Sequence, residues 1–321
     1  MDPISAVAVL LLVVGAIELV AGALTTGVTT DEPIEAEEAR SWIHEGWYLP
    51  EGLVVDGRQD PDNEFASPFV YGPAYEAVAH AVNAVVGNEG IDEISESRGA
   101  YAVRHLVVAL LAALAAMAVG ATVWVVCRSR RFALWSAAAL LAIPQWMGQG
   151  FFNPKDVPVA SGYTIFTLGL VLALVHPGAG SSRFRWLVGT LVAAGFFIAA
   201  GTRLSLIPPL LLTLVGFAAL RLGQRRLGGL AGKMAVDLAV AGGVAAGLGA
   251  IAAIYPTAAS TPIDALSGTV SSAAGYPWQG YTLTAGRLLT EHPPWWYIPV
   301  WVGASMPLLL GALSLLGAGV G

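Results

Sequence analysis

Long runs of apolar residues alternate with short polar segments along most of the chain. A helix needs about 20 mostly apolar residues to cross a hydrocarbon core of roughly 30 Å. Helices suit that core because they pair their own backbone groups where no water is present. The pattern predicts eight membrane-spanning helices, at residues 4–24, 102–127, 132–148, 157–176, 186–202, 204–221, 234–254 and 295–317. Only the short segment Gly201, Thr202 and Arg203 marks the boundary of the fifth span with the sixth, so residues 186–221 form either two helices or one long kinked helix.

The composition agrees with a polytopic, all-α integral membrane protein. Of 321 residues, 56% are hydrophobic and 12% are charged, whereas about 25% are charged in an ordinary soluble domain. The net charge is −6 and the chain has no basic stripe, which argues against a nucleic-acid partner. The single cysteine, Cys127, excludes an internal disulfide and any CxxC metal or redox site.

The distribution of Lys and Arg predicts how the chain is oriented. With the N-terminus in the cytoplasm, the short loops at 128–131, 183–185 and 221–233 also lie there. Together they hold nine of the sixteen basic residues, as the positive-inside rule requires. The loop at 25–101 then lies outside and holds sixteen of the twenty-two acids. A last outer loop follows at 255–294.

The first apolar run is interpreted as an uncleaved anchor. Ala21 and Ala23 form a small-residue pattern like a signal-peptide cleavage site. The segment before the run lacks positive charge, however, and the run is long for a signal peptide. We interpret residues 1–321 as a single membrane domain, and we expect it to be the N-terminal part of a longer chain because residue 321 directly follows a predicted span.

The large outer loop contains two predicted helices. One opens near Asp31, has Pro33 at its first helical position and ends near Gly46; we expect it to lie along the membrane interface. The other runs from Pro73 to Val86 with helical apolar spacing and stops at Gly87. The irregular stretch between them, which includes Tyr71, is expected to form one wall of a site at the outer surface.

Charged residues at the outer ends of the spans are the candidates for chemistry. Asp31 and Glu32 follow the first span, where partial desolvation raises a carboxyl pKa and favours general-base work; alternatively they only charge a helix start. Lys155 and Asp156 lie at another outer boundary, where charges are costly and often functional, or they form a simple counterion pair. Arg203 interrupts an apolar stretch and needs an acid or a phosphate as partner.

Further polar residues have a structural interpretation as well as a functional one. Arg104 and His105 begin the second span on the outer side, and His105 alone is more typical of a structural hydrogen bond than of a base. Glu18 and Asp237 lie within spans, as helix-to-helix hydrogen-bonding groups or as the proton relay of a transporter. Trp278 and the other aromatics of the last outer loop are typical of an interfacial belt, although such rings also stack on sugars.

In this order, the features resemble the GT-C superfamily of membrane glycosyltransferases, in its protein O-mannosyltransferase-like branch. They are a first span, the Asp31–Glu32 pair, an interfacial helix, a Pro-rich outer loop and a second span headed by Arg104. The segment 150–158, Gly-Phe-Phe-Asn-Pro-Lys-Asp-Val-Pro, and the Gly-Thr-Arg segment at 201–203 follow. The resemblance covers nearly the whole chain as architecture.

The resemblance implies an inverting transfer of a sugar, mannose first, from a polyprenyl-phosphate donor. It implies Asp31 as the general base, with Glu32 and Asp156 as further acids of the catalytic site. Candidates for the donor phosphate are Lys155, Arg203 and Arg104, and weaker candidates for acceptor or sugar contacts are His105, Tyr71 and Trp278. It implies no metal and no other cofactor.

The partners implied are the lipid bilayer, the lipid-linked sugar and an acceptor that is a protein, a polysaccharide or a lipid. The expected location is a prokaryotic plasma membrane, with the active site outside the cytoplasm. Two other functions stay open from the residues alone. One is a transporter or flippase that uses Glu18 and Asp237, and the other is a non-catalytic lipid-binding scaffold.

Overall fold

The computed structural model describes residues 2–29, 32–33, 35–36, 54–55, 58–59, 71–88, 98–176, 181–226, 231–274, 282–289, 294–307 and 310–312. Within these residues, six helices are long and apolar enough to cross a membrane. They are α1 (Pro3–Thr25), α4 (Arg98–Cys127), α7 (Asp156–Val175), α8 (Ser182–Thr202), α9 (Ile207–Arg226) and α10 (Ala231–Ile254). The chain therefore has the helices of an all-α membrane protein, and lipid is its expected surroundings.

Two of the eight predicted spans are not single long helices in the described residues. The span predicted at 132–148 is divided into α5 (Arg130–Leu141) and α6 (Pro144–Gln149). The break falls before Pro144, which has no backbone N–H to continue the hydrogen-bond ladder and instead starts the next helix. In the span predicted at 295–317, α13 (Tyr297–Ser305) has nine residues, and part of the remainder lies outside the described residues.

The segment 186–221 forms two helices. Arg203 ends α8 in an extended conformation, with φ −146° and ψ 103°, and a 3-10 turn (η1, Leu204–Leu206) leads into α9. Pro208 and Pro209 fall in the first turn of α9, where a helix tolerates their missing N–H groups. Arg203 therefore lies at the C-terminal end of α8, and the three residues of η1 separate it from α9.

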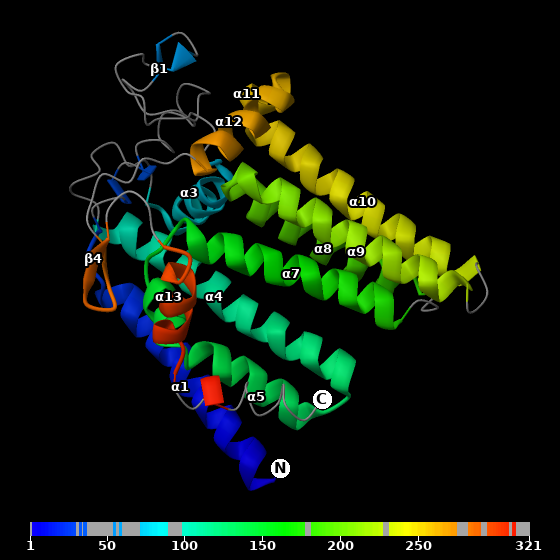
Figure 1. Ribbon diagram of the computed structural model, residues 1–321, viewed down its shortest axis with the longest axis horizontal. Coiled ribbons are helices and arrows are strands. Elements are labelled where there is room, and N and C mark those ends of the chain that lie inside the picture. Colours follow the sequence, from blue (N-terminus) through cyan, green and yellow to red (C-terminus); the bar gives the residue numbers. More distant parts are fainter. Residues whose placement is uncertain are drawn as a thin grey trace.

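Smaller elements gather near one end of the long helices, as Figure 1 shows for α3, α11, α12 and β4, with the N-terminus at the far end of α1. The helix predicted from Pro73 to Val86 is confirmed as α3 (Ala74–Val86), and Gly87 ends it in the left-handed conformation with φ 82°. The others are α11 (Pro256–Ser260), α12 (Pro262–Ala274) and two antiparallel hairpins, β1 (Val54–Val55) with β2 (Arg58–Gln59) and β3 (Thr282–Thr284) with β4 (Arg287–Leu289).

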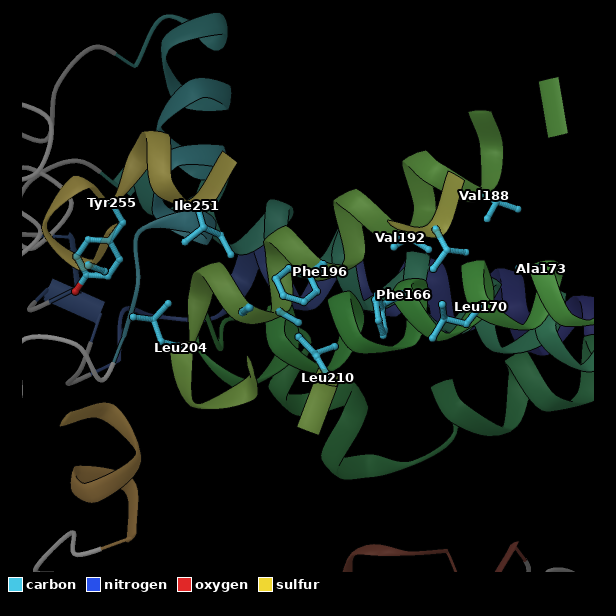
Figure 2. Packing of buried hydrophobic residues seen from close by; sticks show 14 of the residues in the cluster. Phe166, Leu170, Ala173, Val188, Val192, Phe196, Leu204, Leu210, Ile251 and Tyr255 are labelled. Atoms are coloured by element: carbon cyan, nitrogen blue, oxygen red, sulfur yellow. The ribbon is translucent and has the colours of Figure 1, made fainter. Parts of the chain in front are cut away.

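Two buried apolar cores hold the bundle together. One joins α7, α8 and α10 and extends to η1 and α12; Figure 2 shows Phe166 of α7 beside Phe196 of α8 at its centre. The other packs α1 against α4, α5 and α3. At the first core the backbones of α7 and α8 touch, because a Cβ at Gly195 would lie 2.3 Å from Phe166 N. Small residues permit this approach, which is a common way for helices to associate in lipid.

Candidate functional site at the ends of the helices

The segment before α3 is held directly against the end of α8. The backbone N–H of Gly72 donates to the carbonyl oxygen of Thr202 at 2.8 Å. A Cβ at Gly72 would lie 2.2 Å from the carbonyl oxygen of Gly201, so only glycine fits at this crossing. The contact fixes Tyr71, the preceding residue, next to Arg203.

Two cations share the aromatic ring of Tyr71. Lys155 Nζ lies 4.7 Å from the ring centroid, and Arg203 Cζ lies 5.0 Å from it. Arg203 Nη2 also donates to the Tyr71 hydroxyl at 3.2 Å. A ring face attracts a cation within about 6 Å through its quadrupole. Tyr71 therefore holds together two like charges that the chain supplies from different helix ends.

Two carboxylates accompany these cations. Lys155 Nζ lies 2.5 Å from Oε1 of Glu35, which is buried, and Arg203 Nη2 lies 3.4 Å from Asp156 Oδ1. The Asp156 side chain is 64% exposed, so its pair with Arg203 is the looser of the two. We call Glu35, Tyr71, Lys155, Asp156 and Arg203 the ion cluster.

Asn153 sets the backbone that carries Lys155 and Asp156. Its Oδ1 accepts from the backbone N–H groups of both residues, at 2.9 and 2.8 Å. Its Nδ2 donates to Gln149 Oε1 at 2.5 Å and to Asp156 Oδ2 at 3.3 Å. This side chain satisfies N–H groups at the start of α7, where a helix has no internal acceptors for them.

A buried acid and a buried histidine form a second network. Its acid, Glu32, lies three residues before Glu35 of the ion cluster in the sequence. Glu32 Oε1 lies 2.5 Å from His105 Nε2, and the Nδ1 of that ring lies 3.1 Å from the carbonyl oxygen of Ala23. Glu32 Oε2 accepts from the backbone N–H of Thr29 at 2.6 Å. Burial acts to raise the pKa of Glu32, but the hydrogen bonds from His105 and Thr29 outweigh it, and the pKa lies below its ordinary value.

Arg104 is separate from the ion cluster. Its guanidinium is buried and donates to both carboxylate oxygens of Glu76, at 2.5 and 2.7 Å. The hydroxyl of Tyr75, also buried, donates to the Arg104 carbonyl oxygen at 2.9 Å. A bidentate, desolvated pair of this kind joins α3 to α4, so Arg104 is built into the packing and not directed at a ligand phosphate.

The intramembrane acids differ from each other. Asp237 of α10 accepts from Arg221 Nε of α9 at 2.7 Å, which is the helix-to-helix hydrogen bond of the two interpretations given above. Glu18 is exposed on the surface of α1. Asp237 therefore has a partner on a neighbouring helix, whereas Glu18 faces the surroundings of the bundle.

An apolar cavity of about 270 Å³ begins one residue after Arg203. Leu204 and Ile207 line it together with residues of α10, α11 and α12, including Leu248, Ile251, Pro262 and Leu266. The ion cluster and this cavity place charge and an apolar recess next to each other at the same helix ends.

The structure brings together four of the predicted site residues, namely Tyr71, Lys155, Asp156 and Arg203. Glu32 and His105 pair with each other. Asp31 and Trp278 lie outside the described residues. Sequence reasoning missed Glu35 and Asn153 as site residues. Asn153 could have been identified, because an Asn shortly before the first residue of a helix often accepts hydrogen bonds from the backbone N–H groups two and three residues later.

Among the residues that the structure describes, no three His, Cys, Asp or Glu side chains are grouped so that they could bind a metal ion. Comparison of the chain with protein-family models, with curated proteins and with solved structures gave no significant match.

Proposed function

We propose that the chain is an inverting glycosyltransferase of the GT-C type, which moves a sugar from a polyprenyl-phosphate donor to an acceptor hydroxyl at the outer membrane surface. The ion cluster is the observation that carries the proposal. Two cations share one ring at the helix ends, and an exposed carboxylate lies 3.4 Å from one of them. A lipid-linked sugar phosphate presents its charge at the membrane boundary, because its tail stays in the bilayer, and the ends of spanning helices lie at that boundary.

Arg203 and Lys155 are the proposed contacts for the donor phosphate. Exposed ion pairs are weak, typically below about 1 kcal/mol, so a phosphate can replace Asp156 at Arg203. A guanidinium is well suited to this exchange because its planar fork binds two phosphate oxygens at once. Fixed cations of this kind stabilise the charge that develops on the phosphate as it leaves.

The cavity that begins at Leu204 is the proposed seat of the first units of the prenyl chain. Its described lining is apolar, and Leu204 directly follows Arg203 in sequence. Burial of hydrocarbon there is favourable by roughly 25 cal/mol per Å² of apolar surface. The donor would then be held at two chemically different points, its phosphate by cations and its tail by the cavity.

In the proposed reaction the acceptor oxygen bonds to the anomeric carbon as the bond from that carbon to the phosphate oxygen breaks. The hydroxyl proton passes to the carboxylate of Asp31, and polyprenyl phosphate departs. Glu32, one residue later, is anchored by His105 and Thr29, and we assign it a positioning role for the segment that carries Asp31. Mannose is the first donor sugar to test, on the resemblance alone.

The test is donor turnover by the full chain in nanodiscs, followed as release of polyprenyl phosphate from polyprenyl-phosphate mannose with an envelope extract as acceptor. We expect Arg203→Gln and Asp31→Asn each to lower the rate about a hundredfold, the loss typical of one removed electrostatic or basic group. Arg130→Gln is the matched control, because Arg130 is exposed at the start of α5. Release that is equal in all variants, or absent from folded wild type with every lipid-linked sugar tried, contradicts the proposal.

A further inference from the structure

A second recess lies between α6 and α13. It has a volume of about 470 Å³ and is unlike the apolar cavity, because Gln145, Gln149, Trp301 and Ser305 contribute polar or aromatic groups to its lining. The described residues that line it carry no charge. We call it the amide groove. The proposed function makes no use of it.

The groups of the amide groove suit a neutral, hydroxyl-rich ligand. The carboxamide of each glutamine both donates and accepts hydrogen bonds, as sugar hydroxyls do. Ser305 Oγ lies 2.8 Å from Gln145 Oε1 and 2.7 Å from the carbonyl oxygen of Trp301, so the hydroxyl holds the Gln145 side chain close to α13. Trp301 donates its indole N–H to Thr284 Oγ1 at 3.1 Å. This bond holds the ring of a side chain that is 43% exposed, and an aromatic face is apolar enough to pack on a sugar ring.

The groove is connected to the ion cluster by a single residue. Gln149, at its inner wall, accepts from Asn153 Nδ2 at 2.5 Å, and the same Nδ2 lies 3.3 Å from Asp156 Oδ2. Two side chains, Gln149 and Asn153, therefore link a ligand in the groove to Asp156, the acid that faces Arg203. The apolar cavity adjoins Arg203 through Leu204, so the ion cluster has an apolar recess for one ligand and a polar recess for another.

We infer that the amide groove binds the acceptor, and that the acceptor is a carbohydrate chain. The role of this ligand as acceptor rests on the proposed function. The binding of a neutral oligosaccharide in the groove does not depend on that function. A protein acceptor is the other class consistent with a hydroxyl nucleophile. The neutral amides, the serine and the indole favour sugar, since they offer no charged partner for an ordinary peptide and match the equatorial hydroxyls and flat faces of sugar rings.

The experiment is saturation-transfer NMR on wild-type protein in nanodiscs without donor, with mannotriose, maltotriose and xylotriose as probes and a Ser/Thr-rich peptide as the competing class. At least one trisaccharide should bind, and Gln145→Leu and Trp301→Phe should each weaken it about tenfold. The first removes the hydrogen bonds of the amide, and the second shrinks the ring and removes the indole N–H that bonds to Thr284. Trp295→Phe is the matched control, because Trp295 lies just before α13 and is 86% exposed outside the groove.

Gln145 is exposed at the start of α6, so its variant keeps the test informative even if Trp301→Phe does not fold. Trisaccharide binding that is unchanged in Gln145→Leu, no binding of any trisaccharide, or binding of the peptide alone overturns the inference. Donor turnover is measured separately. Binding that depends on the groove in a protein without donor turnover keeps the carbohydrate site and removes the transferase proposal.

Discussion

Tyr71 is the residue on which the geometry of the ion cluster depends. It is fixed from one side by the contact of Gly72 with Gly201 and Thr202, and it receives Lys155 and Arg203 at its ring. Cation–π contacts range from about 0.5 kcal/mol when exposed to about 2 kcal/mol when desolvated. The ring thus offsets part of the repulsion between the two cations that share it.

Replacing the Tyr71 ring should therefore weaken donor use more than removing its hydroxyl. We expect Tyr71→Leu to raise the KM for the lipid-linked sugar about tenfold, because Lys155 and Arg203 lose their shared contact. Tyr71→Phe keeps the ring and should change KM by less than about threefold, since the described cation–π contacts remain and the 3.2 Å hydrogen bond to Arg203 is lost. Steady-state donor kinetics of the two variants measure the difference, and equal effects of both would contradict the assignment to the ring.

Glu32 should make the stability of the chain sensitive to acid. Its pKa in the folded chain lies below the ordinary 4.5, so the carboxylate contributes stability that is present above pH 4.5 and is lost as the pH falls through the lower, folded pKa. Glu32→Gln should be less stable than wild type near neutral pH, and the two should converge in acid. Thermal unfolding in detergent between pH 3 and pH 7 checks this. A stability difference between wild type and Glu32→Gln that does not shrink in acid would contradict the prediction.

At the scale of elements, close packing of helices decides where the charged ends meet. α7 begins at Asp156 and α8 ends at Thr202, next to Arg203. The antiparallel contact of these helices brings the two charges to one place. The contact depends on glycines, since a Cβ at Gly162 would lie 2.5 Å from Ala199 N and one at Gly195 would lie 2.3 Å from Phe166 N.

Gly195→Ala should consequently destabilise the bundle and disturb the ion cluster. The added methyl would push against backbone, which cannot rotate away as a side chain can, and overpacking of this type costs about 1–3 kcal/mol. Gly216→Ala in α9 is the matched control, because a Cβ there meets nothing within 4 Å, and it should be neutral or slightly stabilising. Thermal unfolding of the two variants measures the difference, and equal melting temperatures would contradict the role of Gly195 in helix packing.

At the scale of the whole molecule, the two ends of the bundle have different chemistry. Figure 1 shows the N-terminus at the end of α1 away from α3 and β4. The basic residue Arg128 lies between α4 and α5, and Arg130 and Arg131 begin α5, whereas the ion cluster lies where α7 begins and α8 ends. Positive charge in short loops is retained on the cytoplasmic side, so the ion cluster is expected on the outer side.

The single cysteine provides a direct measurement of this orientation. Cys127 is exposed at the end of α4, and a membrane-impermeant maleimide should label it in inverted vesicles but not in intact cells. In a Cys127→Ser background, Val28→Cys, which lies just beyond α1 at an exposed position, should show the reverse pattern. Labelling of Cys127 from outside the cell would invert the topology and place the ion cluster on the cytoplasmic side.

Local pattern was sufficient for much of the architecture. Apolar runs longer than the membrane is thick identify α1, α4 and α7 to α10 without tertiary information, and Gly87 marked the end of α3 correctly. The same reasoning failed at 132–148, where apolar composition continues across a break at Pro144. The mean hydropathy of a segment does not change when one residue lacks a backbone N–H. The helix does change there, because it loses one of its backbone hydrogen bonds.

The sequence by itself also determined which charges lie at helix ends, because a charge that interrupts an apolar run is visible locally. Only the tertiary structure decided which of those charges pair. Arg104 and Arg203 both border apolar runs, yet Arg104 is buried against Glu76, and Arg203 faces Asp156 and contacts Tyr71, 132 residues away in the chain. The physical reason is that an ion pair depends on the distance between two side chains from different parts of the chain. The packing of the helices sets that distance, and the sequence of one segment does not contain it.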